Sequence, residues 1–580
     1  MTSPITDFKE YSAAIASKFL QTIVVVDDLA YFREEKEAVP INTEIVVPGP
    51  PKLVRGNHNA DDMSSNVLNA TEDEPTKEKI VDVAHKLDAK RLIEDFATKG
   101  MVCAVIKPAD VEVESLQDKV YPIAENCDIV VFDWVLYGEM HGSKVRELIC
   151  GVTKKSSSDT IQRLRLIVVY TGQEDLADIA SSIETSLRES GQEHVTRKDD
   201  YTLESGPVRI AVYAKEFVPV AKENRELAAR VVRIEQMPDR LIREFTDVTM
   251  GLVSNVAVGS MAALRANTHR ILARFHRGLD APFLAHRAML PHPDDANDLL
   301  VYLIGAEITA VLQDSEVGKL ADAYDDLDVI QAWIEMNDAE MANTPDRGFA
   351  NKFSIRNTPE FKENLSKLLR AGFSDKSLPA DFASMKDKPE KAQLTKKLSP
   401  GAFAADRLEH EFAALTTMKS NYRTKVRTPM LLAGTILKQE SEGDVGRNRY
   451  WVCIQPVCDC VRLEGPRTFP FLELAIDQGN FNLVVPDDNE FVRTRFVYKP
   501  YKLKQIDFSP SNDGSGVVRG ERDDTGVFFV NAAGAPFRWI GELKFEHAQR
   551  IINKFASIQS RVGLEESEWL RRSGGPTIDD

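Results

Sequence analysis

The chain has 580 residues, of which 43% are hydrophobic and 28% charged, as expected for a folded protein of several domains rather than a disordered or fibrous chain. Its net charge of −17 argues against a protein that binds nucleic acid non-specifically along its length. Six cysteines are too few for a fold held together by disulfides. No apolar run reaches the roughly 18–20 residues of a membrane span, and no secretory signal is visible, so we expect a cytoplasmic protein without a membrane segment.

The first 218 residues predict a doubly wound α/β domain. Five runs rich in β-branched residues alternate with helical stretches, which is typical of a parallel sheet covered by helices on both faces. The predicted strands are Thr22–Asp28, Val102–Ile106, Ile129–Asp133, Leu166–Thr171 and Val208–Tyr213, and the helices lie near 78–99, 143–152 and 174–189. Residues 33–77, rich in Pro, Asn, Asp and Glu, are interpreted as a surface insertion.

The rest of the chain predicts three further parts. Apolar residues recur at helical spacing over 219–345, which indicates a helical domain. The segment 346–429 is polar and rich in Lys and Pro, and is interpreted as a linker with short helices, one of them at 359–371. From 430 to 580 the apolar period becomes two, which predicts a β-rich C-terminal domain ending in a helix at about 545–559.

Charged and hydroxyl side chains follow the predicted strands at their carboxyl ends. They are Asp27 and Asp28 after the first strand, Asp133 after the third, Thr171 at the fourth and Lys215 just past the fifth. Because these ends meet at one crevice of an open α/β sheet, we expect the side chains to converge there.

Three carboxylates in one crevice require a cation, since two unit charges about 4 Å apart repel by about 4 kcal/mol at an effective dielectric of 20. Oxygen ligands with room for water suit Mg2+. A carboxylate nucleophile beside a metal, a hydroxyl and an ammonium has the parts needed for aspartyl-phosphate chemistry. The alternative is a set of strand-end acids that cap helices or loops.

Four short segments carry a family resemblance: Val25-Val-Asp-Asp-Leu, Val130-Val-Phe-Asp-Trp-Val-Leu, Val168-Val-Tyr-Thr-Gly and Tyr213-Ala-Lys-Glu-Phe217. In this order they resemble the signature segments of the response-regulator receiver domain, which implies a flavodoxin-like doubly wound α/β fold. The resemblance implies that Asp133 accepts a phosphoryl group. It also implies that Asp28, Asp133 and the carbonyl of Val135 bind Mg2+, that Asp27 acts through a metal-bound water, and that Thr171 and Lys215 hold phosphoryl oxygens.

The sequence departs from the receiver pattern at three places. Glu216 follows the lysine where receivers usually have proline, and Tyr137 stands where a proline usually lies four residues past the acceptor. The aromatic switch residue is replaced by Val212, with Tyr213 displaced by one. The residues of the chemistry are therefore present, whereas the usual relay from the phosphate to the surface is not.

These features predict a phospho-acceptor signalling protein of a two-component-like system, in which Mg2+-dependent phosphorylation of Asp133 controls a partner-binding C-terminal domain. The domain organisation resembles divergent receiver-like proteins of bacterial phage-defence islands. That resemblance implies a role in antiviral defence and a histidine-kinase-type or related ATPase as partner. A homo-oligomer also remains open, and no enzyme motif is present beyond the receiver's own phosphorylation and dephosphorylation chemistry.

Two alternatives remain open from the sequence. One is an unphosphorylated receiver-like adaptor that scaffolds an ATPase-containing complex. The other is a nucleic-acid-binding regulator that uses the segment 491–504, where basic and aromatic residues interleave. The basic residues of this patch are Arg493, Arg495, Lys499, Lys502 and Lys504, and its simpler interpretation is the solvated face of an antiparallel strand.

Overall fold

The chain forms two compact units in the computed structural model: Met1–Met336 with Leu365–Arg370, and Asn337–Asn364 with Ala371–Asp580. The structure describes residues 7–32, 86–108, 113–157, 163–192, 194–216, 218, 225–324, 327–337, 359–378, 394–395, 398, 405–420, 428–440, 448–488 and 490–559. The insertion predicted at 33–77 lies outside the described residues, as does much of the segment 346–429.

The first unit is built on a seven-stranded sheet with the order β4-β1-β5-β6-β9-β8-β7. Its strands are β1 (Thr22–Val26), β4 (Val102–Ile106), β5 (Ile129–Phe132), β6 (Arg165–Thr171), β7 (Val195–Asp199), β8 (Thr202–Ser205) and β9 (Val208–Ala214). The strands from β4 to β9 in this order are parallel, and β8 and β7 extend the sheet as an antiparallel hairpin. The predicted α/β fold class is confirmed.

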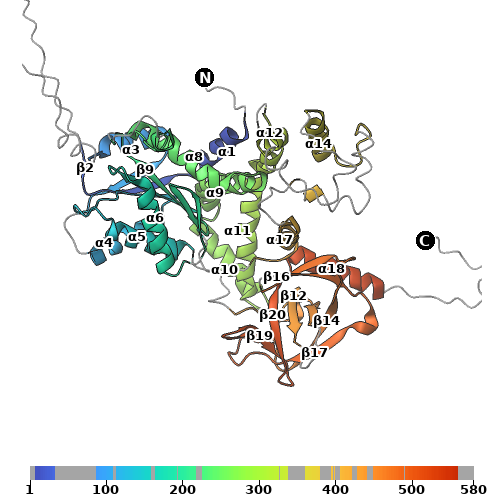
Figure 1. Ribbon diagram of the computed structural model, residues 1–580. Coiled ribbons are helices and arrows are strands. Elements are labelled where there is room, and N and C mark those ends of the chain that lie inside the picture. Colours follow the sequence, from blue (N-terminus) through green and yellow to red (C-terminus); the bar gives the residue numbers. More distant parts are fainter. Residues whose placement is uncertain are drawn as a thin grey trace, which may run out of the picture. The chain divides into compact units, whose positions relative to one another are not determined.

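Helices cover both faces of this sheet (Figure 1). Val24 and Val26 of β1 pack toward α4 (Val113–Ala124), α5 (Ser143–Ser156) and α6 (Leu176–Glu189). The alternate side chains, Ile23 and Val25, pack toward α1 (Phe8–Phe19), α3 (Ala89–Thr98) and α8 (Met237–Thr249). Burial on both faces explains why the central strands are continuously apolar.

Two features of the sheet differ from the sequence prediction. Strand β4 was expected to be as buried as the others, but it is an edge strand and leaves Val102 70% exposed. The hairpin β7–β8 was not expected, because its strands are largely polar and lack a clear apolar alternation. Of the helix predicted near 78–99, the described part begins at Ala89.

The helical segment that follows β9 belongs to the same compact unit. Its helices are α7 (Arg225–Ala228), α8, α9 (Leu252–Arg274), α10 (Asp280–Met289), α11 (Asp295–Asp314) and α12 (Val329–Met336). A small core joins α1, α9 and α12 through Tyr11, Val258 and Val329. Short paired strands also occur: β2 (Ala30–Tyr31) with β3 (Leu87–Asp88), and β10 (Ala323–Tyr324) with β11 (Leu327–Asp328).

The second unit contains an antiparallel nine-stranded sheet, which confirms the predicted β-rich C-terminal part. Its strands are β12 (Thr435–Gln439), β13 (Arg449–Cys453), β14 (Arg467–Ile476), β15 (Leu483–Asp487), β16 (Glu490–Phe496), β17 (Lys504–Phe508), β18 (Glu521–Asp523), β19 (Gly526–Val530) and β20 (Pro536–Glu542). Apolar cores lie on both of its sides, and the closing helix α18 (Phe545–Gln559) contributes Ile551 and Phe555 to one of them. Two further described helices are α14 (Pro359–Ala371), at the position predicted for a short helix and with Leu365–Arg370 assigned to the first unit, and α17 (Ala405–Thr417).

Among the described residues, every helix is too short or too polar to cross a bilayer.

Candidate functional site

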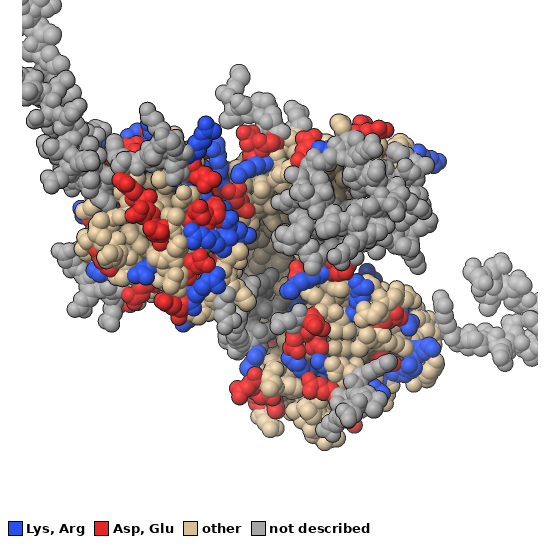
Figure 2. Space-filling model, viewed as in Figure 1, with Lys and Arg blue, Asp and Glu red and all other residues tan. Residues whose placement is uncertain are grey.

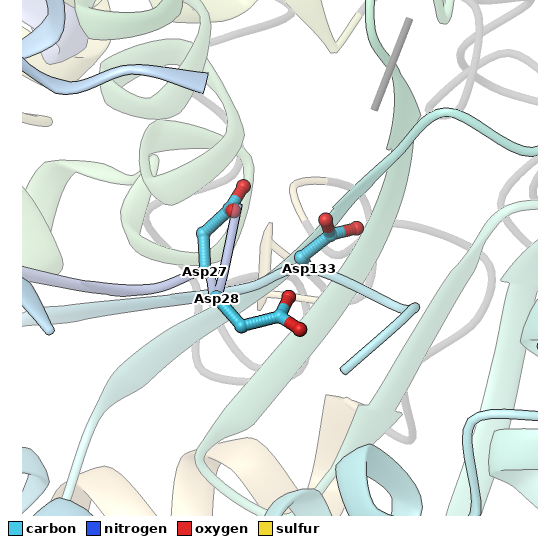
Figure 3. A group of neighbouring side chains, drawn as sticks. All are labelled: Asp27, Asp28 and Asp133. Carbon is cyan, nitrogen blue, oxygen red and sulfur yellow. The ribbon is translucent and has the colours of Figure 1, made fainter. Parts of the chain in front are cut away.

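The carboxyl edge of the parallel sheet brings together residues from four strand ends. Asp27 and Asp28 follow β1, Asp133 follows β5, Thr171 is the last residue of β6 and Lys215 follows β9. Because β1, β5, β6 and β9 are adjacent and parallel, these positions lie side by side at one edge. Figure 3 shows the three aspartates gathered at this edge.

Among the described residues, the acids at this site outnumber the cations. One oxygen from each of the three aspartates lies within 4.8 Å of the others. The Nζ of Lys215 donates to Asp27 Oδ2 at 2.9 Å and to Asp133 Oδ2 at 3.0 Å. All three residues of this ion-paired group are at least 97% buried. One lysine facing three carboxylates leaves an excess of negative charge in a site of low dielectric.

Asp28 is the carboxylate that Lys215 does not neutralise in the described contacts. Its Oδ2 accepts a hydrogen bond from the backbone N–H of Tyr137 at 2.6 Å, whereas its buried Oδ1 has no hydrogen-bond partner among the described residues. An orphaned carboxylate oxygen beside two further carboxylates fits a divalent cation such as Mg2+, which prefers oxygen ligands and retains some of its waters. The residues present therefore fit the metal that the sequence predicts.

The surroundings of Asp133 fix the geometry of this carboxyl. The N–H of Val135 donates to Asp133 Oδ1 at 3.4 Å, so the loop after β5 turns back onto the aspartate. Trp134, in the same loop, is buried and donates its indole N–H to the carbonyl of Met140. Gly142 lies against the Trp134 ring so closely that a Cβ there would come within 2.3 Å of it, which explains the glycine.

Burial controls the protonation of the site. It raises the pKa of Asp133 to about 7, with the Asp27 carboxylate adding to the rise and Lys215 opposing it. Burial alone would lower the pKa of Lys215, but the carboxylates of Asp133 and Asp27 outweigh it and the pKa is raised. The Lys215 ammonium is therefore kept charged, whereas the raised pKa of Asp133 favours the protonated, neutral form of that carboxyl.

Thr171 and Lys215 are tied together by the backbone. The N–H of Lys215 donates to the carbonyl of Thr171 at 2.8 Å, and the Thr171 hydroxyl oxygen accepts from the N–H of Gln173 at 3.2 Å. That contact leaves the hydroxyl hydrogen available as a donor. The Lys215 ammonium also lies 5.8 Å from the centre of the Tyr170 ring, whose hydroxyl donates to the carbonyl of Val232.

Residues 19–219 match the family model described as a response receiver domain. This part of the chain is a receiver domain. A search of curated proteins and a search of solved structures each gave no match to the chain.

The departures of this receiver domain from the usual pattern have local structural roles. Tyr137, in place of proline, has a left-handed backbone with φ of 58° and provides the N–H that binds Asp28. This contact could not be found from the sequence, because a backbone donor leaves no residue-type signal. Glu216, in place of the second proline, lies 3.9 Å from the Arg233 guanidinium.

The predicted basic patch at 491–504 lies in the second unit and is largely paired with its own neighbours. Arg495 contacts Asp477 at 3.2 Å and Lys502 contacts Glu473 at 3.4 Å. Arg493 donates to His410, and Lys504 donates to Gln439 and lies over the Trp451 ring. Lys499 lies 5.8 Å from the centre of the Tyr501 ring.

On the visible face, basic and acidic side chains are interspersed rather than segregated (Figure 2). A surface that tracks nucleic-acid phosphates needs concentrated positive charge. The pairing of Arg495 and Lys502 with acids therefore argues against phosphate binding by this patch.

Proposed function

We propose that this chain is a phospho-acceptor signalling protein in which phosphorylation of Asp133, dependent on Mg2+, controls what the second unit binds. The observation that carries the proposal is the arrangement at the carboxyl edge, where a buried Asp133 is held by Lys215 beside two further acids, one with an orphaned oxygen. Each of the three acids accepts a backbone N–H of a loop, but such capping alone does not account for this excess of buried negative charge.

The residues support nucleophilic attack on phosphorus by a carboxylate oxygen of Asp133. An acyl phosphate bond forms from this oxygen, and the bond from phosphorus to the donor's leaving atom breaks with its electron pair departing on the donor, acetate in the case of acetyl phosphate. The Lys215 ammonium, already 3.0 Å from Asp133, can then bind a phosphoryl oxygen, and the Thr171 hydroxyl can donate to another.

Asp27, Asp28 and Asp133 would hold Mg2+, and the backbone carbonyl of Val135 is proposed as a further ligand. When bound, the metal supplies positive charge that balances the acids and the incoming phosphoryl oxygens. The burial of Asp27, Asp133 and Lys215 restricts water around the reacting oxygen.

The phosphoryl donor that we propose is a histidine-kinase-type or related ATPase protein, since a receiver takes its phosphoryl group from a partner. That this chain acts in a bacterial phage-defence system, and that it resides in the cytoplasm, stay predictions. The adaptor alternative shares the same receiver fold and differs in one respect, which is that Asp133 is never modified.

Intact-mass spectrometry after incubation with acetyl phosphate and Mg2+ tests the proposal directly. We expect wild type to gain the mass of one phosphoryl group, and Asp133→Asn to gain none. Asp175→Asn, which removes an exposed acid from the same domain, is the matched control and should be modified like wild type. If wild type and Asp133→Asn stay equally unmodified after prolonged incubation, the adaptor alternative takes the place of the phospho-acceptor.

Hydrogen exchange with and without beryllofluoride tests the control of the second unit. Beryllofluoride should slow or speed exchange in peptides of that unit in wild type. In Lys215→Ala, binding at Asp133 should persist while the change in the second unit is lost, because the lysine is the cation in contact with the acceptor. An unaltered second unit in wild type would refute this part of the proposal.

A further inference from the structure

A cavity of about 660 Å3 lies in the receiver domain, away from the three aspartates. It is bounded by the last turns of α4 and α5 and by Arg165, the first residue of β6. Because Thr171 is the last residue of the same strand, the cavity and the aspartates lie at opposite edges of the sheet. Helices α4 and α5 can be followed in Figure 1. A cavity of this volume is in the range that small organic ligands occupy.

The lining of this cavity carries an excess of positive charge. Its acid is Glu125, and its cations are Lys154, Lys155, Arg163 and Arg165. Lys155 pairs with Glu125 at 2.6 Å, and this contact is the main cause of the lowered pKa of Glu125. Among the residues that the structure describes, no acid lies within ion-pair distance of the other three cations. The cavity is therefore suited to an anion.

Arg165 is the buried member of this group. It is 3% exposed, and its Nη1 donates to the carbonyl of Ala124. Its Nε has no hydrogen-bond partner in the described part of the chain. Burial, and then the neighbouring Arg163, lower the pKa of Arg165 to about 10. The charged form of this guanidinium is therefore destabilised where it lies, as expected for a buried cation that no acid balances.

A second buried arginine of the same unit shows the contrast. Arg209 is 8% exposed and contacts Glu244 at 2.7 Å and Glu204 at 2.8 Å. Burial alone would lower the pKa of Arg209, but these two acids outweigh it and the pKa is raised. Arg209 has its counter-charges within the chain. Arg165 has none among the described residues, so a bound anion is the simplest source of its counter-charge.

The two arginines of the cavity also cap helix α4, but capping does not explain the whole arrangement. Arg163 donates to the carbonyls of Glu125 and Cys127, and Arg165 donates to that of Ala124. Cations stabilise the carboxyl end of a helix, and exposed side chains suffice for this. Capping requires neither the burial of Arg165 nor a cavity beside it, and it leaves the Arg165 Nε without a partner in the described contacts.

The apolar part of the lining indicates that the ligand is larger than a simple ion. Tyr121, Ala124 and Val152 line one part of the cavity. Gly151 of α5 makes room for Tyr121, because a Cβ at this position would overlap the tyrosine hydroxyl. A water molecule takes up about 30 Å3, so an inorganic phosphate would fill only a small part of the cavity. The ligand therefore needs an apolar body as well as a charge.

The cations favour phosphate over carboxylate as the charged group. A phosphate monoester carries about −1.5 to −2 charges, whereas a carboxylate carries −1, so phosphate balances more of the excess. The guanidinium fork of arginine also matches phosphate oxygens with two parallel hydrogen bonds.

We infer that this cavity binds a small organic phosphate, in which a phosphate monoester is joined to an apolar ring as in a nucleoside monophosphate. Arg165, Arg163 and Lys154 bind the phosphate oxygens, and the apolar part of the lining receives the ring. Binding requires neither Mg2+ nor Asp133, so it is independent of phosphorylation at the opposite edge of the sheet.

Isothermal titration calorimetry of the full chain without Mg2+ tests this inference. The probes are adenosine monophosphate, phenyl phosphate, inorganic phosphate and adenosine. We expect at least one of the two organic phosphates to bind at one site per chain, and inorganic phosphate and adenosine to bind at least about 10-fold more weakly. Comparison of the two organic phosphates distinguishes a nucleotide from a simpler aryl phosphate. Absence of binding by both at millimolar concentration would overturn the inference, as would equally tight binding of inorganic phosphate.

Two substitutions locate the site. Arg165→Gln should weaken binding of the organic phosphate about 10- to 100-fold, because it removes a charged donor. Lys154→Ala should weaken it about 3- to 10-fold. Lys154 is exposed, so this variant keeps its fold even where Arg165→Gln loses the cap of α4, which far-UV circular dichroism checks. Unchanged binding in Lys154→Ala and in a folded Arg165→Gln would refute the proposed site.

The controls separate this cavity from general charge effects and from the aspartates. Lys119→Ala removes an exposed lysine of α4 that does not line the cavity, and it should bind like wild type. Asp133→Asn should also bind like wild type, whether or not Asp133 accepts a phosphoryl group. Loss of binding in Asp133→Asn would place the probe at the other edge of the sheet and overturn the inference.

Discussion

The two units each bury a lysine against carboxylates, and the two lysines differ in what surrounds them. In the second unit, Lys438 of β12 donates to Asp487 Oδ2 at 2.8 Å, and Tyr450 donates to the same oxygen at 2.6 Å. Next to this group Arg538 pairs with Asp488, so two cations face two acids. Among the described residues of the receiver domain, one cation, Lys215, pairs with two acids, Asp27 and Asp133, and a third, Asp28, lies beside them.

The difference distinguishes a structural ion pair from a binding site. The charges of Lys438 and Asp487 balance, and their contacts join β12, β13 and β15, although Asp487 Oδ1, like Asp28 Oδ1, has no hydrogen-bond partner among the described residues. The two sites therefore differ in their balance of charge and not in having an unpartnered oxygen. Buried acids without a matching cation destabilise the fold, and a purely structural role does not explain why they are present. Their presence therefore indicates a ligand that supplies the missing positive charge. The experiments below ask whether the two lysines behave as differently as this argument requires.

The largest effect is expected from removing either lysine. Lys215→Met and Lys438→Met should each destabilise their own unit by about 3–5 kcal/mol, because both leave buried carboxylates unpaired. Mg2+ should recover part of the loss in Lys215→Met and none in Lys438→Met. Hydrogen exchange of peptides from β5 and β13 reports the two units separately, and equal recovery by Mg2+ in both variants would show that the comparison fails.

Removing one acid should change the free energy of unfolding in opposite directions in the two units. Asp487→Asn should destabilise the second unit by about 2–3 kcal/mol, because Lys438 loses its charged partner. Asp133→Asn should stabilise the metal-free receiver domain by about 1 kcal/mol, since it relieves the repulsion from Asp27. Denaturant melts with exchange readout measure both, and destabilisation of the receiver by Asp133→Asn would contradict the idea of excess charge.

The sequence was sufficient to predict the acids of the receiver and their meeting point, because strand-end positions in a parallel sheet follow from the apolar runs. Asp27, Asp28, Asp133 and Lys215 lie together as expected. Their assigned roles in phosphorylation and metal binding stay predictions.

Three features could not be predicted, each for a physical reason. The N–H of Tyr137 that binds Asp28 depends on a left-handed turn and not on a residue type. The hairpin β7–β8 is polar and partly exposed, so it lacks the alternation by which a strand is recognised. The pairing of Lys438 with Asp487 joins residues 49 positions apart, and only the sheet register brings them together.

Metal binding should stabilise one unit and not the other. At ten times its Kd, Mg2+ should raise the stability of the receiver domain by about 1.4 kcal/mol and leave the second unit unchanged. Asp28→Asn should abolish this gain, because it removes one of the three clustered carboxylates, whereas Asp175→Asn should keep it. Thermal melts with and without Mg2+ provide the measurement, and a wild type that does not respond would exclude the metal site.

The smallest effect is an acid dependence confined to the second unit. Burial raises the pKa of Asp487, but its hydrogen bonds from Lys438 and Tyr450 outweigh this, and the folded-state pKa is lowered. A lowered carboxyl pKa contributes stability that is present above the unfolded value of about 3.9 and is lost as the pH falls through the folded value. Below about pH 4 the free energy of unfolding of the second unit should therefore fall by up to about 1 kcal/mol in wild type. The Asp487→Asn variant has no carboxyl at this position, so it should not show this fall. Urea melts of wild type and Asp487→Asn across this range decide the matter, because parallel stability curves for the two proteins would mean that the Lys438–Asp487 pair does not titrate with folding.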